Sequence, residues 1–294
     1  MNGALGITIA RDGDALRVAI APPVPSPVEA MMLGKSPQEV ASLMPRLFNL
    51  CGVAQGLAAR LALGLDAGGS DPRREILRDH LAKFCLRWPQ LLGLSPQALP
   101  ANWSQGGETL RLWLWGGEPP EDIWRWLASG EGVSGVLQVI ADRFAPGEAV
   151  AELPPLTNPI SLIAQENSPA GRVSNDPRMR MIEDRYGRGP LWRALGRAID
   201  LDRLCQDAPI SKLYSKGLAV VAAARGSYAL QAQASDGRVT MLSRVTPTDH
   251  LLAAGGVLER SFATLPACKA DLAPLLVDIL DPCVPVLMKE AANA

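Results

Sequence analysis

The chain of 294 residues lacks an excess of charge of either sign. Its 29 Lys and Arg residues are balanced by 30 Asp and Glu residues, which gives a formal net charge of −1. No basic stripe is present that would release counterions from a phosphate backbone, so nucleic acid is not expected as the main partner. Hydrophobic residues make up 48% of the chain, which is enough for a substantial core.

Long apolar runs are also missing. No stretch of about 18 apolar residues occurs, so no membrane span is expected. The first residues have neither the basic start nor the long apolar segment of a signal peptide. The five cysteines, an odd number without framework spacing, fit a reducing compartment better than a disulfide scaffold. Together these absences predict a cytoplasmic location.

Two stretches of the sequence predict β-hairpins. The first joins residues 7–10 to residues 16–20 through an Asp-Gly turn. The second follows a lead-in strand at 218–223 and joins 228–234 to 239–245 through another Asp-Gly turn. Both elements are therefore expected to be antiparallel.

Helical spacing of apolar side chains predicts most other elements. Ser36-Pro37-Gln38-Glu39 forms a capping box with proline at the first helical position, and this helix leads to Cys51. The other predicted helices follow Cys51, run from Asp71 through Leu81 and Cys85, extend from about Leu191 to Cys205, and cover about Leu272 to Leu280. Residues 145–178, rich in proline, asparagine and serine, are predicted to form a long irregular connection within a single domain over residues 1–294.

Tryptophan is concentrated between residues 86 and 130. Leu112-Trp113-Leu114-Trp115 alternates in the manner of a strand, and the Pro119-Pro120 pair with acidic residues after it predicts the start of a helix. Core packing is the simpler interpretation of this segment. The alternative is an aromatic docking surface, because Trp is enriched at protein interfaces.

Two cysteines lie at positions that favour a thiolate or a rigid turn. Cys51 lies between two predicted helices, where N–H groups and the helix dipole stabilise a thiolate. Cys283 follows Asp281-Pro282, which fixes a turn before it. Taken alone, each could be an ordinary buried cysteine. The remaining cysteines keep that interpretation: Cys85, Cys205 and Cys268.

Segments around and between these two cysteines follow the order of a known family. Cys51-Gly52-Val53-Ala54 resembles the R-x-C-G-V-C-x-x-x-H segment of nickel–iron hydrogenase large subunits, and Asp281-Pro282-Cys283-Val284-Pro285-Val286 resembles their final D-P-C-x-x-C-x-x-H. Three segments between them resemble the P-R-G, V-P-S/T and G-P-x-E segments: Ala224-Arg225-Gly226, Val245-Thr246-Pro247-Thr248 and Gly255-Gly256-Val257-Leu258-Glu259. The resemblance implies an α+β, mainly α fold, with a hydrogenase-large-subunit-like helical core and short antiparallel β-hairpins.

The departures from the family pattern are specific. Ala54 and Val286 stand where the large subunits have their second cysteines. The other departures are Ala58 and Lys289 at histidine positions, Asn49 at an arginine position, and Arg11-Asp12-Gly13-Asp14 in place of R-I-E-G-H, without its proton-relay glutamate. No extension for a maturation protease is expected after Ala294. This combination is similar to the HupK/HoxV family of hydrogenase assembly proteins, which are catalytically inactive relatives of the large subunit.

The resemblance implies a two-thiolate metal site. Cys51 and Cys283 would bind iron, transiently held as Fe(CN)2CO, while Arg225 and Thr248 would donate hydrogen bonds that orient its diatomic ligands. Nickel is not expected, because two of the four thiolates that hold it are missing. The retained cysteines match the terminal nickel ligands and the bridging ones are lost. An iron unit here would therefore need a different geometry.

The remaining polar candidates have simpler interpretations. Asp281 and His250 are possible neighbours of the site, and His80 is expected at the surface or half buried. Without the resemblance, Arg225 would be a turn residue before Gly226. A solvated charged face is predicted for three arginines: Arg185, Arg188 and Arg193.

The sequence is compatible with three functions. The first is a non-enzymatic maturation scaffold or chaperone that holds the iron unit, with the hydrogenase large subunit and upstream iron-delivery assembly proteins as partners. The alternative is a metal-free interaction module of the same machinery. A catalytic subunit has the least support, because the second cysteines and the histidines are missing. A shared metal requires the sulfurs of Cys51 and Cys283 to be neighbours, which the sequence does not establish.

Overall fold

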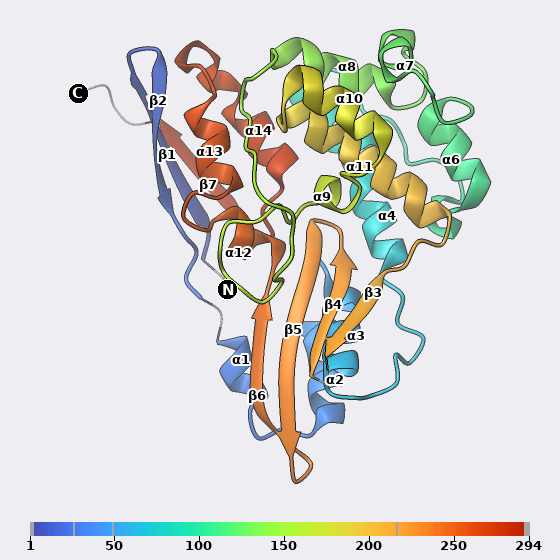
Figure 1. Cartoon of the computed structure of the whole chain (residues 1–294), viewed down its shortest axis with the longest axis vertical. Helices are drawn as coiled ribbons and strands as arrows, with labels where there is room; N and C mark the ends of the chain where they lie inside the picture. Colours follow the sequence, from blue (N-terminus) through green and yellow to red (C-terminus); the bar gives the residue numbers. More distant parts are fainter. Residues whose placement is uncertain (1–2, 26, 49, 216, 291–294) are drawn as a thin grey trace.

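A computed structural model describes residues 3–25, 27–48, 50–215 and 217–290. Asn49 and Ala294, both considered above, lie outside these residues. Most helices gather in one part of the molecule, and two small sheets lie at its edges, as Figure 1 shows. The predicted α+β, mainly α class is confirmed.

The smaller sheet joins the two ends of the chain. Strands β1 (Leu5–Asp12) and β2 (Ala15–Ala21) form the predicted antiparallel hairpin, turning at Gly13 with φ 61°. Strand β7 (Val286–Glu290), which the sequence did not indicate, runs parallel to β1 with Leu5 opposite Val286. The order is β2-β1-β7, seen at one side of Figure 1. The two positions that replace a cysteine and a histidine, Val286 and Lys289, are therefore strand residues.

The larger sheet has the order β3-β4-β5-β6 and is antiparallel throughout. Its strands are β3 (Ser211–Ser215), β4 (Leu218–Ala223), β5 (Gly226–Ser235) and β6 (Arg238–Val245). The predicted second hairpin is confirmed, whereas β3 was not predicted. Helix α3 (Gly52–Ala62) packs on β4 and β5, and α1 (Val28–Met32) contacts β6.

Helix α2 (Pro37–Leu47) and helix α3 cross closely just before and after Cys51. The capping box of Ser36 and Glu39 is present, as predicted. Pro45 lies against Gly52 and Gly56, and a Cβ atom at Gly52 would lie 2.6 Å from the Pro45 carbonyl oxygen. Only glycine allows this approach without displacing the backbone of α2.

The helical core is built around α11 (Pro190–Cys205), whose residues are buried on nearly all sides. The helices that pack directly on it are α4 (Arg73–Ala82), α6 (Gly107–Trp115), α8 (Ser134–Arg143), α9 (Pro169–Arg172), α10 (Pro177–Tyr186) and α14 (Ala273–Leu280). The other helices of this part of the chain are the π-helix η1 (Lys83–Arg87), α5 (Trp88–Leu92), the 3-10 helix η2 (Trp103–Gln105), α7 (Ile123–Ser129), α12 (Pro247–Leu251), α13 (Val257–Ala263) and the 3-10 helix η3 (Ala267–Leu272). The helices predicted over about 191–205 and 272–280 are confirmed. The helix predicted through Cys85 changes to a π-helix after Ala82.

The tryptophan-rich segment is helical where a strand was predicted. Leu112-Trp113-Leu114-Trp115 lies in α6, with Leu110, Leu114 and Trp115 buried and Leu112 exposed. The buried positions follow the helical repeat, which a four-residue alternation could not distinguish from a strand. Helix α7 begins at Ile123, after the Asp122 cap.

Most of the tryptophan side chains pack in the core. Trp88, Trp115, Trp126 and Trp192 are buried, and Trp126 packs edge-on against Trp115 at 4.9 Å between ring centroids. Trp126 also donates its indole N–H to the Trp115 carbonyl at 2.8 Å. Within the tryptophan-rich segment, the core interpretation holds for Trp88, Trp115 and Trp126. The docking alternative stays a prediction for the half-buried ones.

The irregular connection is shorter than predicted, because it gives way to α9 at Pro169 and to α10 at Pro177. Apolar side chains form one large cluster among the helices and the β1–β2 hairpin, and a smaller cluster between α1–α3 and the larger sheet. Among the described residues, no helix combines the length and apolar character needed to cross a membrane.

Candidate functional site

Four segments that are distant in sequence meet at one place. Cys51 precedes α3, Cys283 follows α14, Arg225 lies in the turn between β4 and β5, and Thr248 lies in α12. The thiols of Cys51 and Cys283 are close enough for each to shift the pKa of the other. The fold therefore brings together two cysteines from opposite ends of the chain, which the sequence did not establish.

The two thiols shift each other's pKa in opposite directions. The hydrogen bond from Cys51, the positive charge of Arg225 and a hydrogen bond from Thr248 lower the pKa of Cys283, against the opposing effects of burial and of Asp281. The hydrogen bond to Cys283 and then burial raise the pKa of Cys51. Of the two thiols, Cys283 is thus the one that loses its proton more easily.

Thr248 fixes the backbone at Cys283. The backbone N–H of Cys283 donates to Thr248 Oγ1 at 2.7 Å, and the same hydroxyl helps to lower the pKa of the Cys283 thiol. Helix α12 carries Thr248 and has its own capping box, formed by Thr246 and Asp249. The hydroxyl is thereby held on the sulfur side of the turn.

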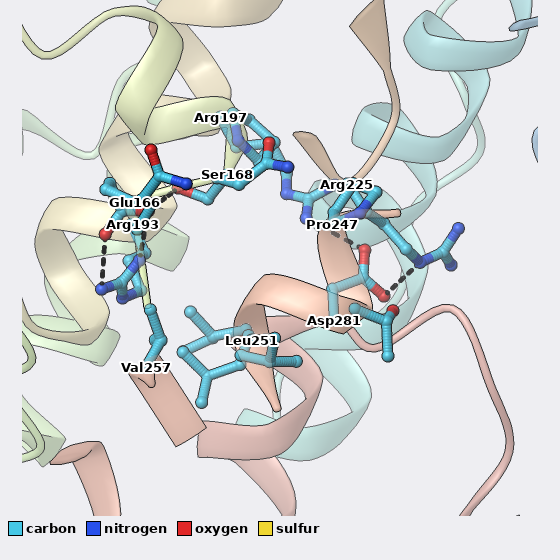
Figure 2. A pocket seen from close by; sticks show the side chains of 15 residues that line it. Glu166, Ser168, Arg193, Arg197, Arg225, Pro247, Leu251, Val257 and Asp281 are labelled. Carbon is cyan, nitrogen blue, oxygen red and sulfur yellow. Dashed lines mark hydrogen bonds and ion pairs between the residues drawn. The ribbon is translucent and has the colours of Figure 1, made fainter. Parts of the chain in front are cut away.

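Asp281 is the anionic centre beside the thiol pair. Its carboxylate contacts Lys83 at 2.9 Å, Arg197 at 3.0 Å and Arg225 at 3.1 Å, and Figure 2 shows it between the two arginines. Burial by itself raises the pKa of Asp281, but the three cations outweigh burial and hold the pKa well below its usual range. The carboxylate is therefore ionised.

Arg225 links this anionic centre to the thiols. Its side chain is 9% exposed and contacts Asp281 and, at 3.5 Å, Asp79. Burial lowers the pKa of Arg225, but the neighbouring groups raise it by more than burial lowers it, so the net shift is upward. These groups are Asp281, Asp79, Cys283 and Cys51. Within the part of the chain that the structure describes, Arg225 Nη1 is buried without a hydrogen-bond partner. A free donor of this kind is an available contact for a small acceptor.

A second layer of charged groups holds these residues in place, and sequence reasoning missed it. Arg172 bonds Asp200 at 2.6 Å and donates to the carbonyls of Ala223 and Gly226, on either side of Arg225. Only the capping Ser168-Pro169 start of α9, which carries Arg172, could have been recognised from local sequence. Arg172 therefore positions the turn that presents Arg225.

His80 is fully buried, so the prediction of a surface or half-buried residue is wrong. Its Nε2 lies 2.8 Å from Asp200 Oδ2 and its Nδ1 lies 3.0 Å from Arg197 Nη1. Burial lowers the pKa of His80 more than Asp200 raises it. A neutral ring that donates from Nε2 and accepts at Nδ1 satisfies both contacts.

The ring of His250 makes hydrogen bonds to the irregular connection before α9. Its Nε2 lies 2.9 Å from the Ser161 carbonyl oxygen and its Nδ1 lies 3.0 Å from Asn167 Nδ2. Asn167 in turn bonds the backbone of Ser227 in β5. These contacts tie the connection before α9 to α12 and β5.

The predicted solvated arginine face is partly wrong. Arg185 is exposed and covers the Trp124 ring, and Arg188 is half buried against Glu183. Arg193, however, is buried in an ion pair with Glu166 at 2.9 Å. Helix α11 is enclosed on nearly all sides, which the spacing of its charges did not indicate.

A cavity of about 20 Å³ lies behind Asp281. Its lining includes Arg225, Thr248 and Asp281, and Figure 2 shows Glu166 and Arg193 at its other side. Leu251 contributes to its apolar wall. This space has room for about one water molecule.

The donor set of the site is limited to sulfur. Among residues 3–25, 27–48, 50–215 and 217–290, no group of three or more His, Cys, Asp and Glu side chains is arranged to hold a metal ion. Two thiols are soft ligands that suit iron or another thiophilic metal, and further positions would have to be filled by groups that the metal brings. The carboxylate of Asp281 is already paired with three cationic side chains, so it is not counted among the metal ligands.

One curated relative matches the whole chain. The sequence is 60% identical over 294 residues, all of both chains, to the hydrogenase expression/formation protein HupK of Rhodobacter capsulatus. No family model matches.

Solved hydrogenases share the fold. The Ni-Fe-Se hydrogenase of Desulfovibrio vulgaris Hildenborough in the reduced state gives a TM-score of 0.59 at 12% identity, covering 93% of this chain and 94% of that one. A variant of the hydrogenase from the same organism gives 0.61 at 12% identity, covering 96% of this chain and 99% of that one. An NAD+-reducing NiFe hydrogenase gives 0.51 at 14% identity, covering 92% of each. At these identities the likeness establishes the fold alone.

Proposed function

The chain belongs to the family of hydrogenase expression/formation proteins represented by HupK, and from this premise we propose that it is a maturation scaffold. It holds the Fe(CN)2CO unit, or a precursor of it, and passes the unit to the apo large subunit of a nickel–iron hydrogenase. The observation that carries the proposal is the thiol pair of Cys51 and Cys283, brought together from opposite ends of the chain.

Binding of a metal to the two thiols would replace their protons. Cys283 loses its proton more easily than Cys51, and a metal bound to both sulfurs would displace the remaining thiol protons. Metal binding by thiols releases protons in this way, so the affinity of the site rises with pH. Two ligands, in place of four, also make release to a recipient easier.

The donors around the pair suit a metal that carries diatomic ligands. The unpaired N–H of Arg225 and the hydroxyl of Thr248 are donors for cyanide nitrogen. Pro247 and Leu251 supply apolar surface in the cavity beside them. Such a mixed lining favours groups with one polar end and little bulk.

The lost cysteine positions argue for a role without turnover. Ala54 is buried, and Val286 lies in β7 opposite Leu5. Neither position offers a donor for a second metal. We therefore propose that nickel is not bound and that the chain acts by ligand exchange and docking, with an upstream iron-delivery protein as donor and the apo large subunit as acceptor.

A metal-free interaction module is the second candidate function. The observation that favours it is the apolar surface beside Cys51, where Leu47, Leu50 and Val53 are 39%, 45% and 38% exposed. Exposed apolar groups next to a site are typical of a docking surface. In this case the thiols would serve no ligand role.

Infrared spectroscopy separates the two candidates. The protein is purified without oxygen from a host that assembles nickel–iron hydrogenase, and cyanide and carbonyl bands are recorded together with the iron content. We expect bands that disappear in Cys51→Ala and Cys283→Ala but persist in Cys268→Ala, which alters an exposed cysteine outside the site. Protein without iron or bands would refute the scaffold. Hydrogen uptake by the isolated chain would restore the catalytic interpretation.

A further inference from the structure

The backbone N–H groups that follow Cys51 need an acceptor. Cys51 occupies the cap position of α3, and among the described residues its side chain makes no capping bond. The first N–H groups of a helix have no partner within the helix. In this chain their acceptor comes from a different helix.

Glu75, in the first turn of α4, supplies both of its carboxylate oxygens to this position. The N–H of Val53 donates to Oε2 at 3.1 Å, and the N–H of Ala54 donates to Oε1 at 2.9 Å. A negative group at the start of a helix is further stabilised by the helix dipole. The carboxylate therefore acts as a fork that ties the residues after Cys51 to α4.

The position of this fork coincides with the altered part of the cysteine segment. Ala54 stands where a second cysteine would place a thiolate, and its buried methyl group leaves the adjoining backbone without that anion. Glu75 contributes a negative charge at the same helix start, and this charge raises the pKa of the Cys51 thiol. On the opposite side, Pro45 packs against Gly52.

We infer that Glu75 is a positioning residue for Cys51: its two backbone hydrogen bonds hold the Cys51 thiol against Cys283 in the absence of a second cysteine. The inference concerns the site of the proposed function and depends on that proposal only for its consequence for bound iron. The proximity of the two thiols can be measured without any metal.

The test is the effective concentration of the two thiols, measured by equilibration with reduced and oxidised glutathione. Two protein thiols and one oxidised glutathione give one protein disulfide and two reduced glutathione molecules, so the ratio at equilibrium reports how well the thiols are aligned. Cys205 and Cys268 are replaced by serine in all variants, because they are half buried and exposed.

Glu75→Ala is expected to lower the effective concentration by about tenfold or more, in the range found when supporting contacts of metal ligands are removed. Glu75→Gln, which keeps one acceptor oxygen, is expected to lower it by about threefold. Asp122→Ala is the matched control, since Asp122 accepts from two backbone N–H groups at the start of α7, at 2.9 and 3.1 Å. It is expected to change the value by less than about twofold.

The inference is overturned if Glu75→Gln and Glu75→Ala both stay within about twofold of the parent, or if Asp122→Ala lowers the value as much as Glu75→Ala. Glu75→Gln alone decides the matter if Glu75→Ala does not fold. Infrared bands in the same variants form the second arm. If the Glu75 variants lower the effective concentration as expected but the parent protein never carries bands, the role of Glu75 stands and the scaffold is refuted.

Discussion

At the scale of single residues, the charge of Asp281 organises the surroundings of the thiol pair. Three cations converge on its carboxylate, from the π-helix η1, from α11 and from the β4–β5 turn. Asp281 itself has φ 57°, a left-handed conformation that Asp and Asn tolerate better than most residues. Its charge can therefore be removed by Asn without disturbing the backbone.

Asp281→Asn is expected to lower the free energy of unfolding by about 3 kcal/mol, because it leaves buried cations without their counter-charge. Urea unfolding measures the change. Asp236→Asn is the control, since Asp236 also has positive φ, at 52°, but lies exposed in the β5–β6 turn. Its effect is expected to stay within about 0.5 kcal/mol. Equal effects of the two substitutions would contradict the charge argument.

Because the buried ring of His80 resists protonation, we expect the protein to lose stability in mild acid. Its Nδ1 accepts from Arg197, so a proton there would face a guanidinium, and burial lowers the pKa of His80 below its ordinary 6.5. Below that pH the unfolded chain binds a proton that the folded chain does not, so the free energy of unfolding falls as pH falls through 6.5. The lowered pKa of Asp200 adds a second decrease as pH falls below 3.8.

Urea midpoints recorded between about pH 8 and pH 5 test this prediction. The midpoint is expected to fall steadily below about pH 6.5, and His80→Gln should reduce the slope. Part of the slope should remain in that variant, because burial also lowers the pKa of His250. A midpoint independent of pH across this range would contradict a neutral His80.

At the scale of elements, the α2–α3 crossing decides where Cys51 lies. Gly52→Ala would place a methyl group against the Pro45 carbonyl, and we expect it to lower the free energy of unfolding by about 1–3 kcal/mol. Gly135→Ala is the matched control near the start of α8, where the nearest atom would be 3.9 Å away. That change is expected to be neutral or to stabilise by up to about 1 kcal/mol. Urea unfolding of both variants gives the comparison, and equal stability would show that the crossing can relax.

The elements also show which features sequence alone can predict. The first hairpin, the capping box of α2 and the long helix α11 follow from local signals, and all three are confirmed. Strand β7 could not be predicted, because its pairing with β1 joins the two ends of the chain. The π-helix η1 has no local sequence signature, yet it directs Lys83 toward Asp281.

The candidate site also contains residues that the sequence could indicate and residues that it could not. The family resemblance selected Cys51, Cys283, Arg225 and Thr248, which the structure brings together; their ligand roles stay predictions. The residues that support them, such as Glu75 and Arg172, were missed. A surface carboxylate and a buried one look alike in a sequence, and only the fold reveals which backbone groups they reach.

At the scale of the whole molecule, two apolar clusters meet near the thiol pair. Cys51 belongs to the smaller cluster, which lies between α1–α3 and the larger sheet, whereas α11 and α14 belong to the larger one. Cys283 follows α14, so the thiol pair bridges elements of both clusters. All seven tryptophans lie in or pack against the larger cluster.

This distribution allows the single domain predicted over residues 1–294 to be tested. Tryptophan fluorescence reports the larger cluster, while far-UV circular dichroism reports both, so coincident urea transitions are expected if the clusters unfold together. Joining Cys51 to Cys283 by oxidation closes a loop over most of the chain and should raise the free energy of unfolding by about 3–5 kcal/mol. Cys283→Ala should remove that gain. Separate fluorescence and dichroism transitions in the reduced protein would show that the clusters are independent units, and the thiol pair would then be a link between two domains.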